Sequence, residues 1–353
     1  IYIFTILLLL SVFIWGPVIN GVQRWIVIGG IQIQPSEIAK LTVIFTTASV
    51  FGYKDRVNEW ILLLISFLLV IPIFFLIYLE PAGSMSLLTL GIWFLVAFTG
   101  LSNQLRNTVA LLILSTISIP FLLISITGNW VYVLIGVVGI VISIFAYYYR
   151  DSWRGIVVGS VFVALLLGVI SLGVYQGVLR EYQKDRIEAF LNPAESSTDI
   201  GFNVNQARIA IGSGQIWGKG FGNGTQSKRD FLPEHQTDFI YASFAEEFGL
   251  IGSLFLLFLY SVILIRTLVV SLDTVQDPFF SMILIGISMK ILLELFINIG
   301  TNTGLIPATG IPLPLISAGG TITVVTLFAL GVIQSIMGRS IKNDNKGSII
   351  DNY

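Results

Sequence analysis

The sequence predicts an all-α polytopic integral membrane protein, with about ten transmembrane helices and one large extracytoplasmic loop. Two observations lead to this fold class. The 353 residues are 55% hydrophobic and only 11% charged, whereas a soluble domain has roughly a quarter charged residues. The apolar residues also gather in runs of the length that a membrane-crossing helix needs, which is about 20 residues.

The apolar runs delimit the predicted spans. They lie near residues 1–16, 37–53, 59–79, 84–100, 107–127, 129–149, 155–176, 239–266, 279–299 and 316–338. The chain opens at Ile1 already inside an apolar run, so we expect an N-terminally truncated start. It has no cysteine and one histidine, which argues against disulfides, thiolate chemistry and a His-rich zinc site.

The basic residues of the short loops predict the orientation, because cytoplasmic loops are enriched in Lys and Arg. Alternate loops and the C-terminal tail carry Lys54, Arg56, Arg106, Arg150, Arg154, Arg266, Arg339, Lys342 and Lys346. The short loops between them have little beyond Arg24. We therefore expect both ends of the chain in the cytoplasm and the large loop, 177–238, outside. This loop opens with a predicted short amphipathic helix within 180–193.

The large loop contains a glycine-rich, basic stretch. The segment "NQARIAIGSGQIWGKGFGNGTQ" (205–226) has six glycines between Gly212 and Gly224. Glycine permits positive φ and close backbone approach, which suits a phosphate cradle, but a structural turn explains these glycines equally well. The spacing fits neither a Walker loop nor a dinucleotide fingerprint. An anionic ligand is favoured by the basic residues Arg208, Lys219, Lys228 and Arg229.

Acidic residues gather where this loop meets the next span, in "FLPEHQTDFIYASFAEEFG" (231–249). Capping of the following helix is the structural interpretation of Asp238. Glu246 and Glu247 lie about two turns into an apolar helix, where carboxylates are costly and usually face a cavity, a partner or a substrate. Asp238 and Glu246, at a helical spacing, are expected to line one groove. An acidic groove under a basic glycine loop is typical of an active site.

A second polar stretch, residues 20–40, reaches the membrane boundary. Arg24 and Trp25 lie in a predicted exterior loop, and Glu37 and Lys40 lie at the start of the following span. Capping by Glu37 and snorkelling by Lys40 would explain these two residues without a function. The position of Lys40 beside an exterior loop nevertheless runs against the positive-inside rule.

These motifs together resemble the SEDS proteins (shape, elongation, division and sporulation), the family of RodA, FtsW and SpoVE. The family's order is kept over nearly the whole chain by "GVQRWI", "QPSEIAK", the glycine-rich stretch, the acidic stretch and "NIGTNTGLIPATGIPLPLISAGG". The segments "ATGIPLP" and "AEEFG" are more similar to RodA than to FtsW. Three positions depart from the family pattern: His235 lies one residue early, Ala318 replaces a Tyr, and "EPAGS" (80–84) lacks an Asp.

The resemblance implies a single SEDS-type membrane domain over residues 1–353, with a helical hairpin inserted at 107–149. It implies a peptidoglycan glycosyltransferase that polymerises lipid II, a disaccharide-pentapeptide on undecaprenyl diphosphate, at the outer face of the bacterial cytoplasmic membrane during cell elongation. The implied partners are a class B penicillin-binding protein transpeptidase and other membrane proteins of the elongation machinery. No nucleic acid is expected.

The resemblance also implies roles for individual residues. Asp238 matches the family's catalytic Asp, and inversion at the donor sugar needs such a base near the acceptor hydroxyl. Arg208, Lys219 and the glycine-loop amides are expected at the departing diphosphate. Asp238 and Glu246 are candidate ligands for Mg²⁺ or Mn²⁺, which suit carboxylate oxygens. The full set of expected substrate-binding residues is Arg24, Trp25, Glu37, Lys40, Gln206, Arg208, Lys219, Thr225, Gln226, Glu234, His235, Thr237, Glu246 and Glu247.

Other functions stay open at this point. A lipid II flippase or another polytopic lipid transporter would have the same composition. Lys290 and Glu294, inside the ninth predicted span, are the best evidence for it, although their spacing also suits an ion pair within one helix. An FtsW-like division or sporulation paralogue, or a scaffold that only binds a partner, would fit as well.

Overall fold

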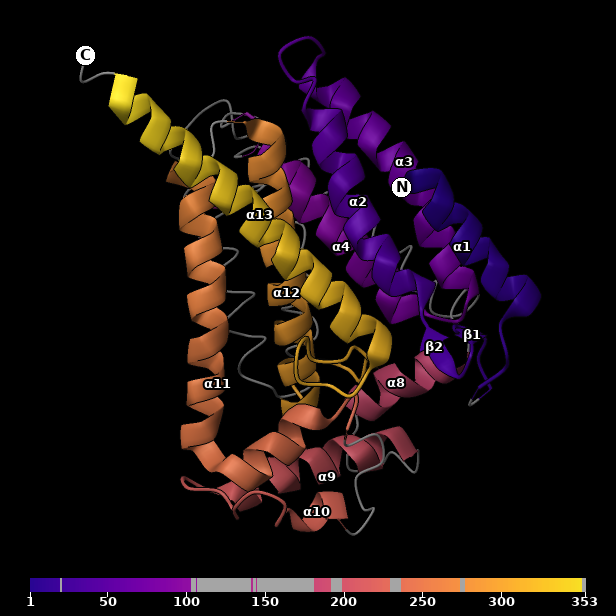
Figure 1. Cartoon of the computed structure of the whole chain (residues 1–353). Coiled ribbons are helices and arrows are strands. Elements are labelled where there is room, and N and C mark those ends of the chain that lie inside the picture. The colour runs from indigo at the N-terminus through magenta and orange to yellow at the C-terminus, as the bar shows by residue number, and fades with distance from the viewer. Residues whose placement is uncertain are drawn as a thin grey trace. The chain divides into compact units, whose positions relative to one another are not determined.

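The computed structural model describes residues 1–19, 21–102, 106, 141, 144, 181–191, 199–228, 236–273 and 277–350 (Figure 1). The chain divides into two compact units, one formed by Ile1–Gly100 with Asp199–Tyr353 and the other by Leu101–Thr198. Apart from residues 141 and 144, the predicted spans at 107–127, 129–149 and 155–176 and the predicted insertion lie outside the described residues.

The described part of the first unit is built mainly from α-helices, as predicted. They are α1 (Tyr2–Trp15), α2 (Pro35–Phe51), α3 (Glu59–Leu79), α4 (Gly83–Gly100), α9 (Asp199–Gly214), α10 (Thr225–Lys228), α11 (Ile240–Asp273), α12 (Pro278–Thr303) and α13 (Gly320–Ile350). Residues 205–214, which the sequence assigned to the glycine-rich loop, are helical in α9. In the second unit, α8 (Glu181–Leu191) forms where the amphipathic helix was predicted.

Five described helices are long and apolar enough to cross a membrane, and they confirm five of the predicted spans. They are Glu59–Leu79, Gly83–Gly100, Ile240–Leu272, Pro278–Thr303 and Gly320–Arg339. The predicted spans at 1–16 and 37–53 are shorter helices, because α1 has 14 residues and α2 has 17. Of the two, α1 is below the range of roughly 17–25 residues for a membrane-crossing helix, and α2 is at its lower end.

In the part of the chain that the structure describes, a β-hairpin departs from an all-α fold. Between α1 and α2, where the sequence predicted a loop, strands β1 (Ile26–Ile28) and β2 (Ile31–Ile33) form an antiparallel hairpin. Gly29 and Gly30 join the strands with positive φ values of 59° and 85°, which a two-residue hairpin turn requires. The run of β-branched residues on both sides of Gly-Gly was the sequence signal for this hairpin.

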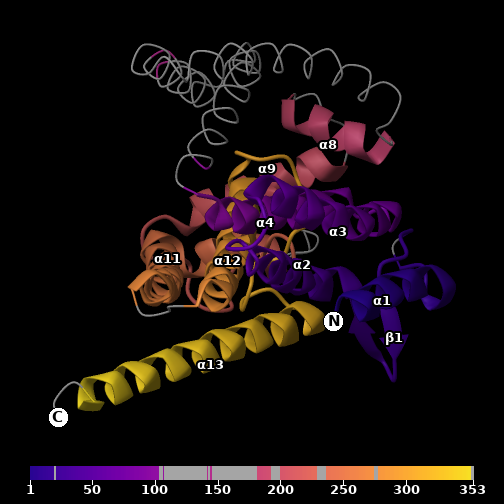
Figure 2. The same cartoon turned by 90° about the horizontal axis from the view of Figure 1, so that it is seen from above.

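The helix α12 lies at the centre of this unit (Figures 1 and 2), packed against α2, α4, α9 and α11. On its other sides, α2 contacts α1, α3 and α4. A Cβ atom added at Gly286 of α12 would lie 2.6 Å from Cγ2 of Ile44 in α2, so this glycine permits a close approach of the two helices. Polar residues of α2 and α12 therefore meet inside the protein.

A sharp break divides α11 near its start. Gly249 has φ 67° and ψ −163°, a conformation that is essentially confined to glycine, and Figure 1 shows the lower end of α11 turning away from its long leg. Glu246 and Glu247 lie about two turns into α11, as predicted, but they precede this break and belong to the short leg of the helix. Asp238 lies in a turn before α11, so its helical spacing to Glu246 does not exist.

Candidate functional site

Two asparagines of α12 hold the backbone of Asp238, the predicted catalytic residue. The carbonyl oxygen of Asp238 accepts hydrogen bonds from Asn298 Nδ2 at 2.9 Å and from Asn302 Nδ2 at 3.0 Å. Asn302 Oδ1 also accepts a bond from Ala242 N at 3.0 Å, in the first turn of α11. Both asparagines are fully buried, while the side chain of Asp238 is partly exposed. The core of the protein thus sets the position of a residue that solvent can reach.

The two residues before Asp238 are held by the segment that precedes α13. Ala318 N donates to Gln236 O at 2.8 Å, and Ser317 Oγ donates to Thr237 O at 2.7 Å. The same Ser317 hydroxyl accepts a bond from Leu313 N at 2.7 Å. Only the main-chain amide of residue 318 takes part, so the replacement of the family's Tyr by Ala leaves this contact intact.

A buried network of four charges joins α12 to α2. Lys40 Nζ lies 2.7 Å from Glu37 Oε1 and 2.5 Å from Glu294 Oε1, and Lys290 Nζ lies 2.7 Å from Glu294 Oε2. The predicted pair of Lys290 and Glu294 is confirmed. Snorkelling of Lys40 is wrong, because its side chain is completely buried. Capping by Glu37 is also wrong, because Gln34 is the N-cap residue and no side-chain cap bond forms.

The polar positions of α12 follow a four-residue spacing. Lys290, Glu294, Asn298 and Asn302 lie on one stripe of the helix, since residues four apart are neighbours on a helix surface. Glu294 binds Lys40 of α2 and is paired with Lys290, and the two asparagines hold Asp238. Of these four residues, only the charged pair Lys290 and Glu294 was predicted from the sequence. The same four-residue spacing leads on to Asn298 and Asn302, and it was the sequence signal by which these two residues could have been found.

Glu246 is the centre of a second polar cluster. Its fully buried carboxylate accepts hydrogen bonds from Lys219 Nζ at 2.7 Å, Thr225 N at 2.9 Å, Thr225 Oγ1 at 2.8 Å, Gln226 N at 3.2 Å and Ser213 Oγ at 3.3 Å. All five of these bonds end on Oε1, and Oε2 accepts only a second, shared bond from Gln226 N at 3.2 Å. The role of Glu246 as a Mg²⁺ or Mn²⁺ ligand therefore stays a prediction. In the described part of the chain, no group of three or more His, Cys, Asp or Glu residues is arranged to hold a metal ion.

The glycine-rich loop is packed tightly against the start of α11. Lys219 N donates to Glu246 O at 3.0 Å and Gly220 N donates to Glu247 O at 2.9 Å. These two amides, which were expected at the diphosphate, are therefore engaged by the protein itself. A Cβ atom at Gly218 would lie 2.1 Å from Glu247 O. The structure thus assigns this part of the loop a packing role.

Substitution of two glycines in this loop should have unequal effects. Gly218 and Gly222 both have positive φ, 77° and 69°, so alanine strains the backbone by roughly 1–2 kcal/mol at either position. At Gly222 nothing lies within 4 Å of an added Cβ, whereas at Gly218 the loop must also move away from α11. We expect Gly218→Ala to lower the Tm by several degrees more than Gly222→Ala. Equal losses of Tm would contradict the packing role.

Arg24 joins the segment before β1 to the turn between α3 and α4. Its Nε donates to Glu80 O at 3.3 Å and its Nη2 donates to Pro81 O. The neighbouring Trp25 is partly buried. The Glu80 carboxylate is 1% exposed, and neither of its oxygens has a hydrogen-bond partner in the part of the chain that the structure describes. Burial raises the pKa of Glu80 to about 8, against the opposing charge of Arg24.

The buried acid at Glu80 should make stability depend on pH. Its folded pKa of about 8 lies above the ordinary value of 4.5, so between these values the folded state binds more protons and stability falls as pH rises. We expect Glu80→Gln to raise the Tm in detergent, and by more at about pH 8 than at about pH 5. Asp55→Asn, in the exposed turn after α2, should show no such dependence. A gain in Tm that is constant with pH would contradict this role.

Arg208 of α9 lies beside the C-terminal end of α12. A Cβ atom at Gly304, which ends α12 with φ 74°, would lie 3.2 Å from Arg208 Cδ. Arg208 is exposed and forms no ion pair with any residue that the structure describes. It therefore presents a guanidinium that no described acidic residue neutralises, at the helix end that carries Asn302. Gln206 of the same helix is partly buried. The two remaining candidates, Glu234 and His235, lie outside the described residues.

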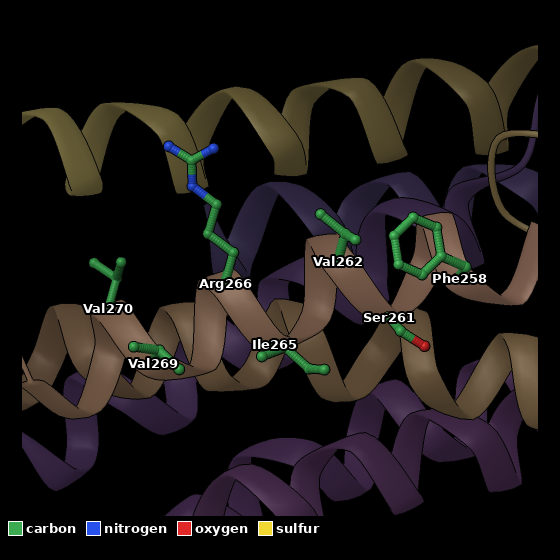
Figure 3. A pocket seen from close by; sticks show the side chains of 7 residues that line it. All are labelled: Phe258, Ser261, Val262, Ile265, Arg266, Val269 and Val270. Carbon is green, nitrogen blue, oxygen red and sulfur yellow. The ribbon is translucent and has the colours of Figure 1, made fainter.

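A groove of about 420 Å³ lies on the outer surface of α11 (Figure 3). It is lined by Phe258, Ser261, Val262, Ile265, Arg266, Val269 and Val270. Figure 3 shows that all these side chains project from one helix, with Arg266 pointing toward α13. None of the candidate residues lines this groove. It belongs to the apolar surface of a membrane-crossing helix and is not the candidate site.

Comparison with known proteins agrees with the resemblance. The family model for cell cycle proteins of the FtsW, RodA and SpoVE group matches residues 1–152 and 132–341. The peptidoglycan glycosyltransferase MrdB of Escherichia coli is 32% identical, over 95% of this chain and 76% of its own length. The probable peptidoglycan glycosyltransferase FtsW of Bacillus subtilis is 31% identical, over 95% of this chain and 72% of its own length.

Solved structures share the fold. A chain of a peptidoglycan synthase complex that coordinates polymerisation and crosslinking has a TM-score of 0.64 at 24% identity, covering 96% of this chain and 80% of that one. The rod-shape-determining protein RodA of Thermus thermophilus has a TM-score of 0.55 at 23% identity, covering 96% and 77%. The chain therefore belongs to the SEDS family of FtsW, RodA and SpoVE, the peptidoglycan glycosyltransferases that cross the bacterial cytoplasmic membrane many times.

Proposed function

We propose that this protein polymerises lipid II into glycan strands at the outer face of the cytoplasmic membrane, with Asp238 as the general base. The placement of Asp238 carries the proposal. Its backbone is held by Asn298 and Asn302 and its side chain is partly exposed. Arg208, which pairs with no acidic residue in the described part of the chain, lies at the same end of α12. A base and a cation around one helix end suit a reaction in which a hydroxyl loses a proton and an anion departs.

The proposed reaction is a single inverting displacement. Asp238 accepts the proton of the acceptor sugar hydroxyl while the hydroxyl oxygen bonds to the anomeric carbon of the donor. The bond from that carbon to the diphosphate breaks, and undecaprenyl diphosphate leaves with the electron pair. Arg208 stabilises the negative charge that grows on the diphosphate. Lys219 has a smaller part in this scheme, because Glu246 already neutralises its ammonium group.

Removal of the proposed diphosphate contact should weaken catalysis. We expect Arg208→Ala to lower kcat/KM for lipid II roughly 10–150-fold, since a lost charge contact costs about 1.5–3 kcal/mol. Arg208→Lys, which keeps the charge, should lose less. The assay is polymerisation of purified lipid II by the purified protein together with its transpeptidase partner. Wild-type rate and half-saturation in Arg208→Ala would remove the residue from the mechanism.

The same assay separates the enzyme from a lipid II flippase. A flippase would bind lipid II without forming polymer. The best evidence for that rival was the pair Lys290 and Glu294, and the ion network with α2 gives both residues a structural partner. Binding without polymer formation by the wild-type protein would nevertheless favour the flippase.

A class B penicillin-binding protein transpeptidase is the proposed partner, because one matched structure is a synthase complex that coordinates polymerisation with crosslinking. Other proposed partners are membrane proteins of the elongation machinery. A role in elongation is our first proposal and a role in division the second, since identities of 32% to MrdB and 31% to FtsW do not separate them. Restored growth of Escherichia coli depleted of MrdB, but not of cells depleted of FtsW, would support elongation.

A further inference from the structure

Three large apolar side chains project from the glycine-rich loop. Ile216 is 55% exposed, Trp217 is 80% exposed and Phe221 is 83% exposed. They extend from a segment whose backbone is fixed, because Gly218 and its neighbours are packed against α11. Exposure of two aromatic rings and an isoleucine to water is unfavourable. Apolar side chains that are exposed close together usually mark an interaction surface.

The loop runs beside the first turn of the long leg of α11. Leu250 N donates to Gln215 O at 2.9 Å and Ile251 N donates to Ile216 O at 3.2 Å. These amides are the first two after the break at Gly249. Leu250 and Ile251 are themselves 53% and 45% exposed. The apolar side chain of Ile216 therefore continues an apolar surface that begins on the helix.

The length of α11 locates the membrane boundary at the same level. The apolar segment has 33 residues, or about 50 Å of helix, which far exceeds the roughly 30 Å hydrocarbon core. Residues 250–272 alone extend about 34 Å. The exposed large apolar residues of this leg are Leu250, Ile251, Leu254, Phe255, Phe258, Leu259, Val262, Ile265, Val269 and Leu272. The long leg is thus sufficient to cross the membrane. The break at Gly249 therefore lies at the boundary of the hydrocarbon core.

Aromatic rings extend this apolar surface past the break. The ring of Phe221 lies 6.1 Å from that of Phe248, and Phe248 stacks on Phe244 at 4.6 Å between centroids. Large amphipathic rings such as that of Trp217 concentrate at the level of the lipid headgroups, where the ring meets acyl chains and the indole N–H meets water. The composition of the loop tip matches that environment.

We propose that Ile216, Trp217 and Phe221 insert into the headgroup boundary of the membrane and anchor the glycine-rich loop to phospholipid. Lys219 lies between the two aromatic residues in sequence, but Glu246 and Thr225 bind its ammonium group, so the three apolar side chains alone form the anchor. The anchor holds the Glu246 cluster at a constant depth relative to the membrane surface. The proposal rests on the membrane fold and does not depend on catalysis by Asp238.

Spin-label accessibility tests this depth directly. The chain has no cysteine, so single labels can be attached through Trp217→Cys and Phe221→Cys in the whole chain of 353 residues. The protein is reconstituted in vesicles of phosphatidylethanolamine and phosphatidylglycerol. The reference labels are Phe255→Cys, on the exposed apolar side of α11, and Asp55→Cys, in the exposed turn after α2. Collision rates are measured with oxygen, which concentrates in lipid, and with a water-soluble nickel chelate.

The expected result is that oxygen collides more often than the nickel chelate at both loop labels, as it does at Phe255. The reverse order is expected at Asp55. A predominance of nickel collisions at Trp217 and Phe221 would overturn the proposal, because the loop would then lie in water. Protection of both labels from both reagents would overturn it as well, since protein rather than lipid would cover the loop tip.

Discussion

Asp238→Asn is expected to lower the turnover of lipid II about 10²–10⁴-fold, with folding and lipid II binding unchanged. Asparagine has the size of aspartate, and the backbone carbonyl that Asn298 and Asn302 hold is present in both. The variant loses only the ability to take up a proton from the acceptor hydroxyl. The measurements are kcat for polymerisation, lipid II binding and the Tm in detergent.

Asp277→Asn is the matched control for this substitution. Asp277 caps α12, where its Oδ1 accepts a hydrogen bond from Phe279 N at 2.9 Å, and asparagine caps a helix about as well. Activity of this variant should be normal. If Asp238 were only a capping residue, Asp238→Asn would behave in the same way, and full polymerisation would refute the base. Activity restored by high Mn²⁺ would instead assign Asp238 to metal binding.

The elements that sequence predicted correctly are those whose determinants lie within the element. The helices α3 and α4 follow apolar runs bounded by polar or flexible residues, and their observed bounds, 59–79 and 83–100, match the prediction to within one residue. The end of α11 was predicted too early, at 266 instead of 273, because Arg266 was counted as a loop residue. An exposed arginine does not end a long helix, because its side chain can extend away from the helix and keep its charged group in water.

Contacts between distant residues account for most of what sequence missed. Besides Glu37, Lys40 binds Glu294, 254 residues further along the chain, and no rule of helical spacing connects Lys40 with Glu294. Asn298 and Asn302 gave a local signal, but both donate to the backbone carbonyl of Asp238. Every residue has such a carbonyl, so the sequence does not indicate which one they bind. Asp238 itself was identified only through its resemblance to a family motif. Physical reasoning on the sequence left its capping and catalytic roles open.

The glycine-rich loop shows a different limit. The glycine spacing correctly indicated close backbone approach. A bound phosphate and a packed helix both require a residue without a Cβ atom, so the glycines do not distinguish between them. The structure places the short leg of α11 against Gly218, with Glu247 O as the nearest atom. Sequence offered no means to choose between these partners, because Lys219 suits a phosphate and the Glu246 carboxylate equally well.

Glu294→Leu is expected to lower the free energy of unfolding by about 3–5 kcal/mol. Glu294 binds two lysines, Lys40 through Oε1 at 2.5 Å and Lys290 through Oε2 at 2.7 Å, and all three side chains are completely buried. Its loss leaves Lys290 without a counter-charge where water cannot reach it, while Lys40 keeps Glu37. The cost of an unpaired buried charge exceeds that of a lost hydrogen bond. Chemical denaturation in detergent measures the change.

The double variant Lys290→Met, Glu294→Leu distinguishes two causes of lost stability, an unpaired buried charge and altered packing. It removes a positive and a negative charge together and leaves the neutral pair of Lys40 and Glu37. We therefore expect it to be more stable than Glu294→Leu alone, although it changes more atoms. Because the next residues on this stripe, Asn298 and Asn302, hold Asp238, turnover should recover in parallel with stability. A double variant as unstable as the sum of its single changes would show that packing, and not charge pairing, dominates at the junction of α2 and α12.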